Sequence, residues 1–274
     1  MDRYIKTYPD QFINVGIAEQ NMLGISAGLA AEGYHPVVTT YATFVTMRSC
    51  EQIRHYLGYM QQKVVVVGSG AGLSQGFAGN THYTIEDISM MRAIPNLQII
   101  SPADGASAAK LFHVALASKN PVYIRLTGNL NCPISYKEDA TFTFGGCNKL
   151  RGGEDVTIFA CGTMVSTALT AAKLLAEQDI EASVVDMYSI KPLNKEAINA
   201  AKGSRLIVTL EEHSKMGGLG AAVAEVMCED IGFPRLMRLG IADCFDLACD
   251  YDGLLNLNRL TAPQIAKDIL NALK

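Results

Sequence analysis

The sequence has no excess of charge of one sign, no paired cysteines and no long hydrophobic run. Its 23 basic and 27 acidic residues give a formal net charge of -4 without charge runs, so binding to nucleic acid or to an anionic membrane surface is not indicated. The seven cysteines are scattered without a CxxC pair, which argues against a disulfide framework and a zinc site. No apolar run has the length of a membrane span, and the opening MDRYIKTYPDQ does not resemble a signal peptide. We therefore expect a cytoplasmic protein that acts on small molecules.

The common phosphate-binding and catalytic motifs are also absent. The sequence contains no GxxxxGK[ST], no HExxH and no GxSxG. The segment GSGAG at 68–72 follows an expected strand, but Leu73 stands where a GxGxxG dinucleotide motif needs glycine. A Rossmann-type site is therefore not expected.

Apolar, β-branched runs alternate with helical patterns through the first half of the chain. The strands are expected at 35–41, 63–67, 97–100 and 121–126, and the helices at about 45–60, 84–92 and 104–118. This alternation is typical of a parallel, doubly wound α/β domain.

A second alternating series follows a change of composition. Residues 128–153 are rich in Gly, Asn, Pro and charge without a period, as in a linker. Strands are then expected at 155–160, 182–186, 205–210 and 235–239, and helices at 163–178, 194–202, 217–229 and 262–273. The pattern predicts two doubly wound, three-layer α/β/α domains, residues 1–130 and 153–274, joined by a linker at 131–152.

A single acid, Glu19, stands where an extended apolar stretch meets a helix of small residues, in NVGIAEQNMLG at 14–24. In one interpretation Glu19 is an acid in a first helical turn, where the helix dipole stabilises it by up to roughly 1 kcal/mol. In the other it is a buried carboxyl group beside a cofactor and transfers a proton. Its position alone does not decide between them.

The five histidines fall into two groups. His35, His55 and His113 stand at helix or turn positions that suit a surface or packed role. His82 and His213 lie in Gly-rich connections after strands, and such connections bind ligands in parallel sheets.

The motifs NVGIAEQNM, TYATF, NTHYTIED, MRAIPN, SPAD, SIKPL and EEHSKMGGLG follow one another along the chain. In this order they resemble the C-terminal half of a transketolase, specifically the smaller subunit of split transketolases, over nearly the whole chain. The resemblance implies a pyrimidine-binding domain from about residue 10 to 130 and a transketolase C-terminal domain after about 150. It also implies dependence on thiamine diphosphate.

The resemblance implies that this chain works with a partner. The GDG…N motif, which in the family binds the diphosphate through Mg²⁺ or Ca²⁺, is absent here. The metal ligands are therefore expected on a separate N-terminal subunit, in a heterotetramer of two copies of each chain. Self-association is expected through the C-terminal domain. The pyrimidine domain begins some forty residues earlier in split transketolases, so we expect either a shortened domain or a strand supplied by the partner.

For Glu19 the resemblance implies the functional interpretation. A buried carboxyl group in thiamine enzymes bonds N1′ of the aminopyrimidine and favours the imino tautomer, whose nitrogen removes the C2 proton of the thiazolium ring. The apolar residues around Glu19 are expected to keep this group dry.

Four further residues are expected at the same site. Phe44 either stacks on the pyrimidine ring or packs in the core, and the family pattern favours the cofactor pocket. Tyr41 and Arg48 line that pocket in the same scheme, although the spacing to Arg48 differs by one residue from that in deoxyxylulose-phosphate synthases. His82, in the TH position of the family, is expected to face the sugar and bond its oxygens or move a proton.

The function implied is transfer of a two-carbon ketol unit between sugars. Three alternatives stay open: a deoxyxylulose-phosphate-synthase-like enzyme, the beta subunit of a 2-oxo acid dehydrogenase, and a non-catalytic relative. The C-terminal domain carries no evident chemistry, so His213 is expected to be structural. Cys161 and Cys228 are expected to be small core residues.

Three positions depart from the family pattern for a sugar phosphate. Transketolases use a histidine and an arginine for the phosphate and an acidic GED segment for a hydroxyl group, whereas the matching positions here are Gly70, Phe77-Ala78 and Gly128. We therefore expect an atypical sugar that is unphosphorylated, modified or differently charged. In the alternative interpretation Arg125, Arg48 or a partner residue replaces the missing phosphate ligands.

Overall fold

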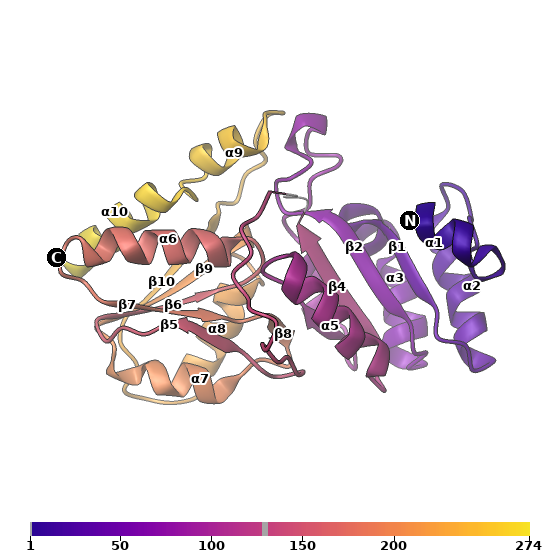
Figure 1. Ribbon diagram of the computed structural model, residues 1–274, viewed down its shortest axis with the longest axis horizontal. Coiled ribbons are helices and arrows are strands. Elements are labelled where there is room, and N and C mark those ends of the chain that lie inside the picture. The colour runs from indigo at the N-terminus through magenta and orange to yellow at the C-terminus, as the bar shows by residue number, and fades with distance from the viewer. Residues whose placement is uncertain (1, 128–130) are drawn as a thin grey trace.

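The computed structural model describes residues 2–127 and 131–274, which form two sheets lying side by side (Figure 1). The first sheet contains, in spatial order, β1 (Val37–Tyr41), β2 (Val65–Ala71), β4 (Val122–Thr127), β3 (Gln98–Ile100) and β8 (Ser189–Lys191). The second contains β10 (Leu236–Ile241), β9 (Leu206–Ser214), β6 (Val156–Ala160), β7 (Ala182–Asp186) and β5 (Asn148–Arg151). Within the described ranges, neighbouring strands are parallel except β8 against β3 and β5 against β7.

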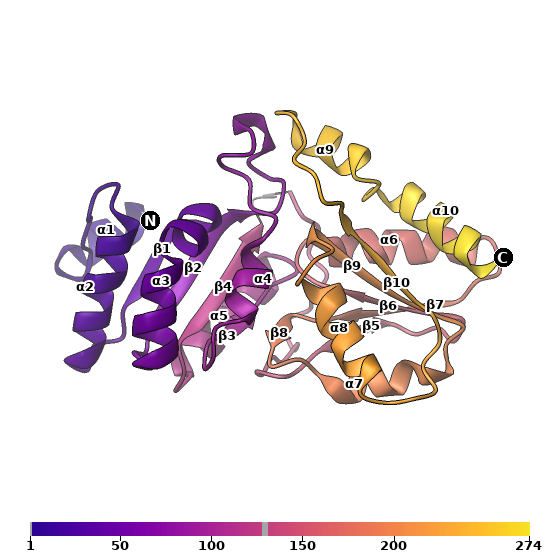
Figure 2. The ribbon, with the colours of Figure 1, turned by 180° about the vertical axis from the view of Figure 1, so that it is seen from behind.

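Helices cover both faces of each sheet (Figures 1 and 2). On the first sheet, α5 (Gly105–Ala117) lies on one face, and α2 (Glu19–Ala31), α3 (Cys50–Gln52) and α4 (Asp87–Arg92) lie on the other, with α1 (Asp2–Thr7) before α2. On the second sheet, α6 (Met164–Ala176) and α10 (Ala262–Leu273) lie opposite α7 (Lys195–Ala200) and α8 (Leu219–Cys228). The helix α9 (Tyr251–Leu257) precedes α10. The predicted α/β class is confirmed.

The central strands explain this layering. All residues of β6 (VTIFA) and of β7 (ASVVD) are buried, as expected for parallel strands covered on both faces. In α10 the buried residues Ile265, Ala266 and Ile269 form one apolar face, and α10 packs against α6.

The predicted secondary structure lacked α1, β8 and α9, and it was wrong in two further places. Residues 148–151, placed in the linker at 131–152, form β5, which pairs antiparallel with β7. A short edge strand that is only partly buried has no apolar period to reveal it. The helix predicted at 45–60 is irregular, because π-helical turns at Phe44–Arg48 and Ile53–Tyr59 flank the short α3.

The two halves of the chain share the first sheet. The strand β8 comes from the second half and pairs antiparallel with β3, with Ile100 opposite Ser189. It covers the β3 edge of the sheet, so the second half of the chain contributes one strand to the first sheet.

A buried charged group also joins the two halves. Arg125, which is 1% exposed, donates from Nε to Asp87 Oδ2 at 2.8 Å and from Nη2 to the carbonyl oxygen of Glu212 at 2.9 Å. The Glu212 carboxylate accepts hydrogen bonds from the hydroxyl of Tyr251 (2.6 Å) and from the backbone N–H of Leu73 (2.6 Å). Buried charges need such partners, so this contact fixes how the halves meet.

His213 lies in the same interface and is fully buried. Its Nδ1 is 2.7 Å from the carbonyl oxygen of Ser214, and the backbone N–H of Ser89 donates to Nε2 at 3.4 Å. Burial lowers the pKa of His213 to about 4, so the ring is neutral near pH 7. This packing agrees with the structural role expected for His213.

The cysteines differ in their surroundings. Cys161 is buried as expected, but Cys228 is exposed, so its predicted core position was wrong. Cys228 is the last residue of α8, where the helix reaches the surface. Among the described residues, no helix combines the length and apolar character needed to cross a membrane.

Candidate functional site

The five residues singled out in the sequence lie together at one end of the first sheet. The aromatic rings of Tyr41 and Phe44 are 5.8 Å apart, and the His82 ring lies 5.5 Å from Phe44 and 6.4 Å from Tyr41. The Arg48 guanidinium lies 4.6 Å from the centre of the Phe44 ring, and its Nη1 is 2.8 Å from Glu19 Oε2. A chain of direct contacts therefore links all five side chains.

The parallel pairing of β1 and β2 produces this arrangement. Tyr41 is the last residue of β1 and lies opposite Ser69 of β2, so the connections after the two strands leave the same edge of the sheet. Phe44 and Arg48 follow β1, and His82 follows β2. Carboxyl ends of parallel strands are the usual place for a ligand.

Glu19 is the first residue of α2 and is 6% exposed. The preceding Ala18 offers no side-chain cap, and an acid in the first turn of a helix is favoured by the helix dipole. The desolvated position expected from the sequence is present. Its ion pair with Arg48 was not expected, and this cation adds to the stabilisation of the carboxylate.

The π-helical turn at Phe44–Arg48 places Phe44 and Arg48 on the same side. A π turn holds about one residue more than an α turn. The one-residue difference in the spacing to Arg48 falls at this wider turn. The turn is held by Thr46, whose hydroxyl donates to the carbonyl oxygen of Ala42 at 2.7 Å.

His82 lies in a loop closed at its base by backbone pairing. The N–H of Gly72 donates to the carbonyl oxygen of Thr84 at 2.8 Å, and the N–H of Thr84 donates back to Gly72 at 2.9 Å. The Thr81 hydroxyl is 2.9 Å from Nδ1 of His82. His82 is half-buried, and its ring lies edge-on to Phe44.

The second half of the chain holds this loop, which sequence reasoning missed. The N–H of Cys249 donates to the carbonyl oxygen of Gly76 at 3.2 Å, and the Tyr83 hydroxyl donates to the carbonyl oxygen of Asp246 at 3.3 Å. The fully buried Leu254 of α9 packs against Gly76. In Figure 1 the segment leading into α9 lies beside this loop. The C-terminal half therefore supports the site, although it contributes none of the five residues.

Of the positions that depart from the family pattern, Gly70 contacts a site residue, and Phe77 and Ala78 lie in the loop that carries His82. Gly70 is buried against the Tyr41 ring, with φ of +65°, and an added Cβ would lie 3.1 Å from Tyr41 Cδ1. Phe77 is 72% exposed, and Ala78 follows it in the loop that carries His82. Gly128 lies outside the described residues. The described positions offer an aromatic surface and no cationic side chain.

Arg125 does not replace the missing phosphate ligands. It is 1% exposed and its guanidinium is held by Asp87 and by backbone carbonyl groups. The Arg48 side chain is 48% exposed and lies at the site. Of the two arginines considered from the sequence, only Arg48 is accessible to a ligand.

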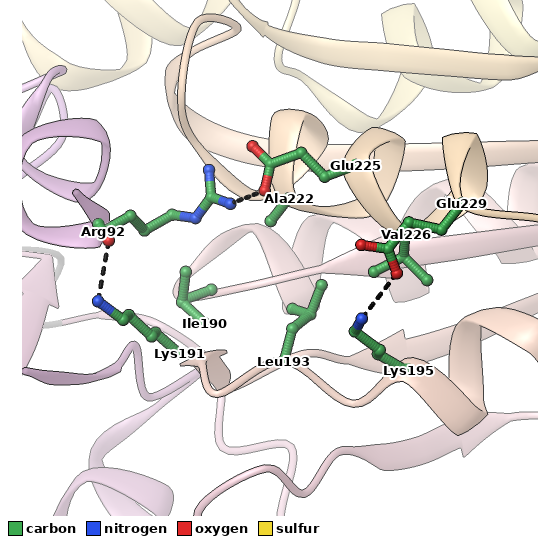
Figure 3. A pocket seen from close by; sticks show the side chains of 9 residues that line it. All are labelled: Arg92, Ile190, Lys191, Leu193, Lys195, Ala222, Glu225, Val226 and Glu229. Carbon is green, nitrogen blue, oxygen red and sulfur yellow. Dashed lines mark hydrogen bonds and ion pairs between the residues drawn. The ribbon is translucent and has the colours of Figure 1, made fainter. Parts of the chain in front are cut away.

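A pocket of about 230 Å³ lies elsewhere, between α4, β8 and α8 (Figure 3). Four of its charged side chains form two pairs: Arg92 Nη2 is 2.5 Å from Glu225 Oε2, and Lys195 Nζ is 2.8 Å from Glu229 Oε2. Lys191 donates instead to the backbone carbonyl oxygens of Arg92 and Ile94. The pocket is lined by none of the five site residues. Within residues 2–127 and 131–274, no group of three or more His, Cys, Asp or Glu residues is placed to hold a metal ion.

Two family models match the chain. The transketolase pyrimidine-binding domain matches residues 2–132, and the transketolase C-terminal domain matches residues 145–265. The chain is similar to a 6-deoxy-6-sulfo-D-fructose transketolase subunit of Clostridium sp. (40% identity, 97% of this chain and 82% of the relative). It is also similar to one of the subunits of an apulose-4-phosphate transketolase of Phocaeicola vulgatus (41%, 83% and 73%). A solved structure described as a split gene transketolase, inactive beta4 tetramer, matches with a TM-score of 0.89 at 38% identity, over 98% of this chain and 86% of that one.

Proposed function

The chain belongs to the transketolase family, as the smaller subunit of a split enzyme that depends on thiamine diphosphate and transfers a two-carbon ketol unit. From this we propose the following roles for its residues. Glu19 is the acid at N1′ of the cofactor, and Phe44, Tyr41 and Arg48 line the pyrimidine pocket. His82 faces the sugar. The observation that carries the proposal is the meeting of Glu19, Phe44 and His82 at one edge of the sheet.

The pocket residues suit an aminopyrimidine ring. Glu19 offers a buried carboxyl group for a ring nitrogen, and the neighbouring Phe44 offers a face for stacking. Thiamine diphosphate, when bound, supplies the nucleophilic carbon that attacks a ketose. Glu19 then holds a proton at N1′, and its burial keeps water from competing for that proton.

His82 is proposed to act on the sugar oxygens. Its ring packs against Phe44 and Tyr41, so its position relative to the pyrimidine pocket is fixed by aromatic contacts. A histidine in this place bonds a carbonyl or hydroxyl oxygen and moves a proton at that oxygen.

A second subunit is proposed to complete the enzyme. It would carry the diphosphate-binding residues and the Mg²⁺ or Ca²⁺ ligands, in a heterotetramer with two copies of each chain. The inactive beta4 tetramer of a relative supports both the need for a partner and self-association of this type of chain. We assign residues 1–130 to the pyrimidine domain and 153–274, together with β5, to the C-terminal domain. Seven free cysteines support a cytoplasmic location.

The substrate is proposed to be a modified or differently charged sugar. Each charge-assisted hydrogen bond to a phosphate contributes roughly 1.5 to 3 kcal/mol, and Gly70, at the position of a family phosphate ligand, provides none. Phe77 stands where the family has an acidic group for a hydroxyl, and it cannot bond one. Arg125 is occupied in the interface. A relative acts on a sulfonated fructose, and another on apulose 4-phosphate, so related subunits serve unusual sugars.

The test is a substrate panel on the chain mixed with its diphosphate-binding partner. The panel contains 6-deoxy-6-sulfofructose, apulose 4-phosphate, xylulose 5-phosphate with ribose 5-phosphate, and pyruvate. We expect ketol transfer from a modified sugar and no turnover by either subunit alone. Use of xylulose and ribose phosphates at a kcat/KM of about 10⁴ M⁻¹s⁻¹ or more would contradict the substrate proposal. Decarboxylation of pyruvate without ketol transfer would contradict the assigned activity.

A further inference from the structure

Arg48 contacts both groups that are proposed to receive the aminopyrimidine. Its Nη1 lies 2.8 Å from Glu19 Oε2, and its guanidinium carbon lies 4.6 Å from the centre of the Phe44 ring. We propose that Arg48 is a built-in occupant of the pyrimidine pocket, which closes the pocket in the free chain and is displaced when the cofactor binds. This inference rests on the proposed function and gives Arg48 a role beyond lining the pocket.

The chemistry of a guanidinium group explains why it fits there. It is planar, carries N–H donors that match a carboxylate, and stacks on aromatic rings. An aminopyrimidine ring is also planar, bonds a carboxyl group along one edge and stacks through its face. An aminopyrimidine bonded to the Glu19 carboxyl group and stacked on Phe44 would compete with Arg48 for both groups.

The Arg48 side chain is free to leave while its backbone stays in place. The side chain is 48% exposed, whereas that of its partner Glu19 is 7% exposed. The carbonyl oxygen of Arg48 accepts a hydrogen bond from Gln20 Nε2 at 3.0 Å, which ties the π turn to α2. Displacement therefore requires rotation of one side chain and leaves Phe44 in position.

Arg125 shows the opposite arrangement. It is 1% exposed, and the carboxylate of Asp87 and the carbonyl of Glu212 hold both ends of its guanidinium. A fully buried ion pair of this kind is costly to break. The half-exposed pair of Arg48 is much weaker, which suits a contact that opens for a ligand.

In the chain without cofactor, the Arg48 side chain stabilises the buried carboxylate of Glu19. A buried carboxylate without a partner is unfavourable, and Arg48 supplies the partner until the cofactor arrives. The consequence is that cofactor binding must first break the Arg48–Glu19 pair. Removing Arg48 should therefore strengthen cofactor binding, whereas removing an ordinary cofactor ligand weakens it.

The experiment measures thiamine diphosphate binding by equilibrium dialysis, without substrate, to this chain mixed with its partner subunit. We expect Arg48→Gln to bind the cofactor about fivefold more tightly than the wild type, the size of one half-exposed ion pair. Arg54→Gln is the matched control, because Arg54 is an exposed arginine six residues further along the same segment, and it should leave the affinity unchanged. Circular dichroism checks that both variants are folded.

Equal or weaker binding by Arg48→Gln overturns the inference. A second readout follows Arg48 itself: the ¹⁵N signals of its guanidinium should change when cofactor is added to the complex, and signals that stay unchanged also overturn it. If the wild-type complex takes up no thiamine diphosphate, the proposed function fails instead. The two failures are thus distinguished in one series.

Discussion

Leu254 of α9 occupies the space that a side chain at Gly76 would need, because a Cβ atom built at Gly76 overlaps Leu254 Cδ1. The two residues are far apart in the sequence and belong to opposite halves of the chain. Gly76 lies in the loop that carries His82, so the packing of a C-terminal helix controls the position of a residue proposed to face the sugar.

Gly76→Ala should therefore disturb the His82 loop. The added methyl group overpacks against Leu254 at a cost of about 1 to 3 kcal/mol, which the loop relieves by moving. We expect a lower kcat/KM with thiamine diphosphate binding retained, measured on the two-subunit complex. Adding Leu254→Val should recover part of the loss, because a shorter side chain frees the space. Gly24→Ala is the control for stability of the single chain, since nothing lies within 4 Å of its added Cβ, and this variant should be neutral or more stable.

Glu19→Gln should abolish most of the turnover and leave the fold intact. The amide keeps the shape of the side chain but cannot hold the acidic proton at N1′, so activation of the cofactor should slow by about 10²- to 10⁴-fold. The measurement is hydrogen–deuterium exchange at C2 of bound thiamine diphosphate, with circular dichroism for the fold. Exchange at the wild-type rate would remove Glu19 from the proposed role.

His82→Ala should separate sugar chemistry from cofactor binding. The ring packs on Phe44 and Tyr41 but makes no contact with Glu19 other than through Phe44 and Arg48. We expect kcat/KM to fall by about 10²-fold or more while the dialysis constant for thiamine diphosphate changes little. His55→Ala, at an exposed position next to Tyr59, should have no effect on either quantity. A loss of cofactor affinity in His82→Ala that matches its loss of activity would point to a packing role instead.

Asp186 should make the free energy of unfolding depend on pH above neutrality. It is fully buried, Oδ1 has no partner, and burial raises its pKa to about 8. The folded chain therefore keeps a proton that the unfolded chain loses near pH 4, so stability falls as pH rises from about 4 to about 8. The pKa of His213 is lowered to about 4, so this group makes stability rise with pH between about 4 and 6.5 and has no effect above that range. Burial raises the pKa of Glu211 to about 7, so below pH 7 this group adds to the loss of stability with rising pH that Asp186 causes.

Asp186→Asn should consequently flatten the stability curve between pH 7 and 8. The asparagine oxygen can still accept the hydrogen bond that the Tyr136 hydroxyl donates to Asp186 Oδ2 at 2.6 Å. Urea unfolding of the single chain at several pH values measures the slope. Asp155→Asn, at an exposed pair with Arg205, is the control and should leave the slope above pH 7 as in the wild type. An unchanged slope in Asp186→Asn would show that another group titrates there.

Much of this molecule was determined by the local sequence. The alternation of apolar strands with helices depends on periodicity within short windows, so most strands and helices of both halves were predicted. The same holds for Glu19 at the start of α2, because the change from an extended to a helical pattern is visible within a few residues. The motifs around Glu19, Phe44 and His82 indicated the family, and the family matches confirmed it.

Only the tertiary structure decided how these parts meet. The pairing of β8 with β3, the packing of Leu254 on Gly76 and the burial of Arg125 join residues that no sequence period relates. The same is true of the ion pair between Glu19 and Arg48. A local pattern specifies which face of an element is apolar, but contacts between distant segments depend on the crossovers and register of the complete sheet, and these are fixed only when both halves pack.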